Sequence, residues 1–64
     1  MAEHGNRAVY FEFTAIGNVV KVTAIDSETG TEVSVMGPVT ASQTDLQQLA
    51  MQKLKARLKR EELP

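Results

Sequence analysis

Apolar and polar residues alternate along the first part of the chain, where Val9, Phe11, Phe13 and Ala15 occupy every second position. Such alternation is typical of a β-strand with one buried face. Gly17-Asn18 follows and predicts a two-residue hairpin turn, because glycine readily adopts a positive φ. Closing this turn places Ile16 opposite Val19 and Phe13 opposite Val22, so the apolar positions of both strands share one face. The pattern therefore predicts an antiparallel hairpin.

A second turn is predicted over residues 26–31. The Asp26 side chain can accept hydrogen bonds from the loop backbone, and Gly30 stands where a four-residue hairpin loop needs a left-handed residue. Closing Asp26 onto Thr31 puts the apolar residues of the second and third strands on the same face. The third strand is expected over residues 31–36, ending at Gly37-Pro38 because proline lacks a donor for the ladder.

The hydrophobic period becomes helical over residues 42–62. Ser42 is the expected N-cap, with Asp45 three residues later, and a helix over 42–60 would be about 28 Å long. Its apolar stripe is Leu46, Leu49, Ala50 and Leu54. The predicted fold is α+β: a three-stranded antiparallel meander, order 1-2-3, followed by one C-terminal amphipathic helix on one face. We expect residues 1–6 to form a disordered tail and residues 7–62 a single βββα domain.

Composition makes a partner surface the expected source of further stability. A 64-residue domain buries only about 60 % of the surface that its unfolded chain exposes. The chain has no cysteine and one histidine, His4, which excludes disulfides, thiolate metal sites and multi-histidine sites. We therefore predict a homodimer, with room for an unidentified protein partner. Both edges of the predicted sheet are open, and pairing of the first or the third strand with a second chain would give one continuous six-stranded sheet. No cofactor and no metal are expected.

Two surfaces carry more apolar residues than the core needs. One is the outer face of the sheet, and the other is a helix side that Lys53 and Arg57 set apart from the main stripe. These two cations either extend their charged ends past the sheet margin, or they border a second apolar strip that faces a partner. The candidate interface residues are Tyr10, Val19, Ile25, Met36, Met51, Leu54 and Leu58.

The C-terminal part of the helix is basic and suggests an alternative, contact with nucleic-acid phosphates. The candidate contacts are Lys53, Lys55, Arg57, Lys59 and Arg60. The net charge is only −1, no stacking platform of aromatics is evident, and cations also stabilise helix C-termini. A solvated helix end is therefore the favoured interpretation, and membrane binding is not expected.

Catalysis is not expected. His4 lies in the predicted tail, no cysteine is present, and no serine or threonine has an obvious base. No signal peptide or membrane-spanning run is recognisable, so a cytoplasmic protein is expected. The leading hypothesis is a small, non-catalytic, homodimeric protein-interaction module.

Several short runs across residues 9–58 resemble a small uncharacterised family of alphaproteobacterial proteins. These runs are Tyr10-Phe11-Glu12-Phe13, Gly17-Asn18, Lys21-Val22-Thr23-Ala24-Ile25-Asp26, Thr29-Gly30, Glu32-Val33, Gly37-Pro38, Leu49-Ala50 and Lys53-Leu54. They are mostly turn and core positions. The resemblance implies a bacterial cytoplasmic setting and an unknown function, and it assigns no site residue.

Overall fold

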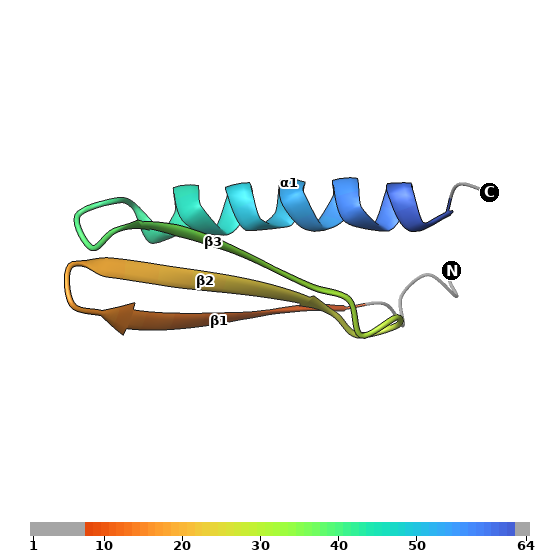
Figure 1. Cartoon of the computed structure of the whole chain (residues 1–64), viewed down its shortest axis with the longest axis horizontal. Coiled ribbons are helices and arrows are strands. Elements are labelled where there is room, and N and C mark those ends of the chain that lie inside the picture. The colour runs from red at the N-terminus through yellow and green to blue at the C-terminus, as the bar shows by residue number, and fades with distance from the viewer. Residues whose placement is uncertain (1–7, 63–64) are drawn as a thin grey trace.

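The computed structural model describes residues 8–62, which form three strands followed by one helix (Figure 1). The elements are β1 (Val9–Ile16), β2 (Val19–Asp26), β3 (Glu32–Pro38) and α1 (Gln43–Glu62). The sheet is antiparallel with order β1-β2-β3, which confirms the predicted α+β fold. β3 begins one residue later than expected and includes Gly37-Pro38. The expected tail, residues 1–6, lies outside the described residues.

The first hairpin has the predicted register. Ile16 pairs with Val19 and Phe13 pairs with Val22, and Gly17 takes a φ of 60°. The glycine thus supplies the positive φ that a two-residue turn needs, at little steric cost.

The second turn is held by hydrogen bonds to the backbone and to the side chain of Asp26. Its backbone N–H donates to the Thr31 carbonyl at 2.9 Å, and Gly30, with a φ of 77°, donates to the Asp26 carbonyl at 2.8 Å. The Asp26 carboxylate accepts from the Thr29 N–H at 2.9 Å and from the Thr29 hydroxyl at 2.8 Å. Asp26 is fully buried, so these bonds satisfy a polar group inside the fold.

The helix begins as its sequence predicts. The Asp45 N–H donates to Ser42 Oγ at 3.3 Å, and the Leu46 N–H donates to the Ser42 carbonyl at 3.1 Å. Ser42 is therefore the N-cap, satisfying one of the free donors of the first turn.

The core lies between α1 and the two strands β2 and β3. Figure 1 shows β1 as the strand farthest from the helix. The buried apolar residues are Val22, Ala24, Val33, Leu46, Ala50 and Leu54. Three expected core residues are instead exposed: Phe13 by 40 %, Leu49 by 51 %, and Ala15. Phe13 is on the strand that α1 does not cover, and Leu49 lies to one side of the buried helical stripe.

Gly37 is where α1 approaches the sheet most closely. A Cβ built at this position would lie 2.6 Å from Leu46 Cδ2, well inside van der Waals contact. Leu46 is itself buried, with 5 % of its surface exposed, so it has little room to move aside. Gly37 therefore does more than end the strand, because its missing side chain makes space for a core leucine.

We expect Gly37→Ala to lower the free energy of unfolding by about 1–3 kcal/mol, because it overpacks this contact. Urea denaturation would measure the change. In a Leu46→Ala background the same substitution should be neutral or slightly stabilising, since the clash is gone and alanine restricts the unfolded chain. Equal costs in both backgrounds would show that the Leu46 contact is not the cause.

Candidate interaction surface

Within residues 8–62 nothing pairs with the outer edge of β1, which is a terminal strand of the sheet. The Ala8 N–H donates to Ser27 Oγ and the Ser27 N–H donates to the Ala8 carbonyl, both at 2.9 Å. Backbone groups alternate in direction along an antiparallel strand, so the even-numbered residues of β1 bond to β2. The backbone groups that point away from the sheet belong to Val9, Phe11, Phe13 and Ala15. β1 contains no proline, so each of the four presents both a donor and an acceptor.

Apolar side chains flank this edge on the face of the sheet that carries α1. Phe11 is half-buried and packs against the core cluster, whereas Phe13 and Ala15 are exposed. The helix packs mainly on β2 and β3 and leaves Phe13 and Ala15 exposed. The edge of β1 is therefore hydrophobic as well as able to form hydrogen bonds.

The outer face of the sheet is apolar at its two ends and polar between them. Tyr10, which is 60 % exposed, pairs with the half-buried Ile25 at one end. Ile16, which is 56 % exposed, pairs with the half-buried Val19 at the other. The intervening positions are Glu12, Thr14, Lys21, Thr23, Ser34 and Met36, of which only Met36 is a large apolar residue. The predicted interface residues of this face are thus divided between separate areas.

A hydrogen bond ties together the middle of this polar region. Thr23 is 7 % exposed, and its hydroxyl lies 3.0 Å from Ser34 Oγ across the β2–β3 pair. Both groups are thereby satisfied within the fold. The centre of the outer face offers no continuous apolar patch to a partner.

The edge of β3 differs from that of β1 because one of its outward donors is missing and one of its outward acceptors is occupied. The Asp26–Thr31 and Asn18–Val39 bonds fix the alternation, so the even-numbered residues of β3 point outwards. Pro38 has no N–H, and Lys53 Nζ donates to the Ser34 carbonyl at 2.7 Å. Proline and lysine are both typical means of protecting a sheet edge.

The second apolar strip expected on the helix was Met51, Leu54 and Leu58, and the prediction is wrong for Leu54. Leu54 is fully buried between α1 and the sheet and belongs to the core, so it offers no surface to a partner. Met51 and Leu58 are half-buried, and Leu58 also packs against the core cluster. The contact of Lys53 with the sheet margin agrees with the alternative in which this side chain extends past an apolar stripe.

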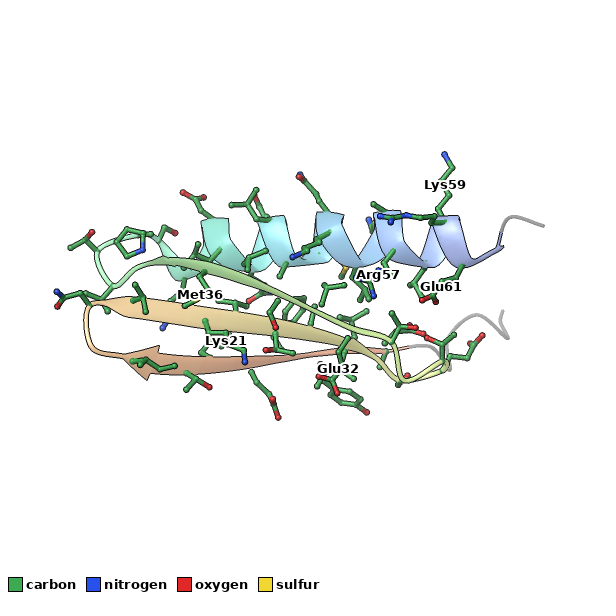
Figure 2. All side chains as sticks on the ribbon, viewed as in Figure 1. Lys21, Glu32, Met36, Arg57, Lys59 and Glu61 are labelled. Carbon is green, nitrogen blue, oxygen red and sulfur yellow. The ribbon has the colours of Figure 1, made fainter. Side chains whose placement is uncertain are left out.

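The five cations of the basic segment do not share one surface. Lys55 and Lys59 are four residues apart and lie on one side of α1, whereas Lys53, Arg57 and Arg60 lie on another. Figure 2 shows Lys59 pointing away from the sheet, and Arg57 and Glu61 on the side of the sheet. Glu61 Oε1 accepts a hydrogen bond from the Thr31 hydroxyl at 3.1 Å. The positive charge is therefore distributed around the helix.

Residues 8–62 contain no group of three or more His, Cys, Asp or Glu side chains arranged to hold a metal ion. In that same part of the chain no helix is both long and apolar enough to cross a membrane. Asp26 is fully buried, and its bonds to Thr29 give it a role in the turn.

A family model for a domain of unknown function (DUF6898) matches residues 6–61, so the chain belongs to this family. The match covers nearly all of the folded region and assigns no activity to it. No curated protein and no solved structure matches the chain.

Sequence reasoning placed Phe13 and Ala15 in the core and so missed them as surface residues. The alternation identified their face correctly, since both lie on the face that carries α1. The signal that could have found them is geometric: a helix is about 10 Å wide, whereas three strands about 4.8 Å apart need more cover. One strand of the three had to stay exposed.

Leu54 and Leu49 provide a test of the helix placement. We expect Leu54→Ala to lower the free energy of unfolding by about 2–5 kcal/mol, because it empties a fully enclosed site. Leu49→Ala, the matched control on the same helix, should change it by only about 0.5 kcal/mol. Chemical denaturation of both variants would measure the difference, and similar costs would contradict the observed orientation of α1.

Proposed function

We propose that the protein is a small, non-catalytic, homodimeric interaction module, and that its self-association surface is the open edge of β1. The observation that carries the proposal is the contrast between the two sheet edges. β1 presents unobstructed backbone groups beside exposed apolar side chains, while Pro38 and Lys53 obstruct β3. A long, flat, hydrophobic edge left open is a site for pairing with another strand.

The side chains along β1 add the hydrophobic contribution that an edge needs. Tyr10, Phe13 and Ile16 are three of the large hydrophobic residues that stay exposed in the folded chain, and all belong to this one strand. Removing apolar surface from water contributes about 25 cal/mol per Å². Because association costs an estimated 4–15 kcal/mol in lost freedom, we expect a stable pair to need both the backbone bonds and this burial.

The proposed setting is the bacterial cytoplasm. The resemblance to an alphaproteobacterial family supports it, as does the absence of cysteine from the sequence.

Light scattering over a range of concentrations tests the proposal. We expect the wild-type chain to reach twice the 7.0 kDa mass of one protomer. Phe13→Lys should raise the dissociation constant at least about tenfold, which corresponds to 1.4 kcal/mol, because it places a charge in the paired edge. Met36→Lys is the matched control, since Met36 is a large apolar residue that is also exposed, by 60 % against 40 % for Phe13, but lies on β3.

Far-UV circular dichroism would verify that each variant is folded. Ala15→Pro gives a second measurement, because it removes a donor from the free edge where proline is tolerated. A monomer mass for the wild-type chain would contradict the proposal. So would a dimer that Met36→Lys dissociates and that neither β1 variant affects.

The alternative function, binding to nucleic acid through the basic end of α1, has a separate test. Phosphate contacts would give an affinity that falls steeply with salt and is lost when Lys55 and Lys59 are both changed to glutamate. Because the cations lie on different sides of the helix, we expect titration with RNA and DNA at low salt to detect no binding of this kind. Salt-dependent binding that the double variant abolishes would favour the alternative.

A further inference from the structure

We infer that two copies of the chain join through antiparallel β1 strands in one particular register, with Phe13 opposite the partner's Phe13 at the two-fold axis. This inference rests on the proposed function and deepens it, since it identifies the partner surface and its alignment. Three properties of β1 select this register: the direction of its backbone groups, the position of its one charge and the placement of its exposed apolar residues.

Backbone direction limits the alignments that are available. Only the odd-numbered residues of β1 point their N–H and C=O groups away from β2, so odd residues must pair with odd residues across the axis. The symmetric choices therefore have either Phe11, Glu12 or Phe13 nearest the axis. The Phe13 register forms about six backbone hydrogen bonds, through Phe13 with its own copy and Phe11 with the partner's Ala15, and the Glu12 register forms about eight. The choice between these registers therefore rests on the side chains.

The charge of Glu12 distinguishes these alignments. An axis at Glu12 places two carboxylates directly opposite each other on the outer face, which is unfavourable for a cross-strand pair. The Phe13 register instead places Glu12 opposite the partner's Thr14. Glu12 is the only charged residue in β1, so no other like-charge pair arises along this strand.

The apolar residues of the outer face distinguish them further. In the Phe13 register Tyr10 lies opposite the partner's Ile16, and this contact joins the Tyr10–Ile25 end of one sheet to the Ile16–Val19 end of the other. An axis at Phe11 would place Tyr10 opposite Glu12 and leave Ile16 beyond the pairing. Of the three registers, only the Phe13 register thus places the two apolar areas directly opposite each other across the axis.

The position of α1 leaves room for this arrangement. Each helix packs on its own β2 and β3, and a two-fold axis perpendicular to the sheet places both helices on the same face. The two β1 strands lie between them, so the helices do not collide. On this face the exposed Phe13 side chains of both copies meet at the centre.

Cysteine cross-linking tests the register directly, because the native chain contains no cysteine. Glu12→Cys and Thr14→Cys both replace exposed residues of the outer face. In the Phe13 register residue 12 faces residue 14 of the partner as a non-hydrogen-bonded pair, with Cα atoms about 4.5 Å apart and within reach of a disulfide. Identical residues would be diagonal neighbours about 7–8 Å apart, beyond that reach.

The experiment mixes the two full-length variants in equal amounts, oxidises them mildly and identifies the linked species by intact mass. A mixture of Thr14→Cys with Glu32→Cys is the matched control, because Glu32 is exposed on β3, at the opposite edge. We expect the disulfide between residue 12 of one chain and residue 14 of the other to form in a larger amount than the 14–32 disulfide of the control. The symmetric 12–12 and 14–14 disulfides should form only in amounts similar to that control.

The remaining outcomes separate the register from the proposed function. A dominant disulfide between two Glu12→Cys chains would overturn the register in favour of the axis at Glu12. Cross-linking at the control level in a protein of dimer mass would overturn the register but not self-association, because an axis at Phe11 or a contact away from β1 would both give this result. A monomer mass at every concentration would overturn both proposals.

Discussion

The packing of one helix on two strands is the constraint that governs the rest of this structure. A helix about 10 Å wide spans two strands spaced about 4.8 Å apart, and here Leu46, Ala50 and Leu54 settle over β2 and β3. Gly37 lets the helix approach closely on the β3 side. β1 is held by its pairing with β2 and by Val9 and Phe11, which pack against the core, whereas its Phe13 and Ala15 side chains on the helical face remain exposed.

Because α1 covers β2 and β3 but not β1, the two edges of the sheet have different properties. On the β3 side the helix supplies both apolar cover and a lysine that occupies an edge carbonyl. On the β1 side neither is present, and large apolar residues remain in water. The exposed apolar residues are therefore concentrated on the β1 side of the sheet. Their uneven distribution, more than their total area, favours β1 as the edge that interacts.

Local features of the chain were predictable because each depends on residues close in sequence. The alternation of apolar positions and the placing of Gly17 and Gly30 define both hairpin registers, since a slip of one residue would turn a whole strand over. The Ser42 cap was predictable for the same reason. The lateral position of α1 was not, because helical period identifies the buried side of a helix but not which strands lie beneath it. Phe13, Ala15 and Leu49 were wrongly placed in the core for that reason. Leu54 was correctly placed in the buried stripe, but its second assignment, to a strip facing a partner, was wrong.

The obstruction of the β3 edge by Pro38 and Lys53 has a consequence for the size of any assembly built on β1. A sheet that can bond at both ends adds chains without limit, and such growth leads to fibres. A chain with one usable end reaches a finite product, because the two-fold pairing that consumes both β1 edges leaves only obstructed ends. One proline and one lysine thus separate a closed six-stranded particle from an open-ended polymer.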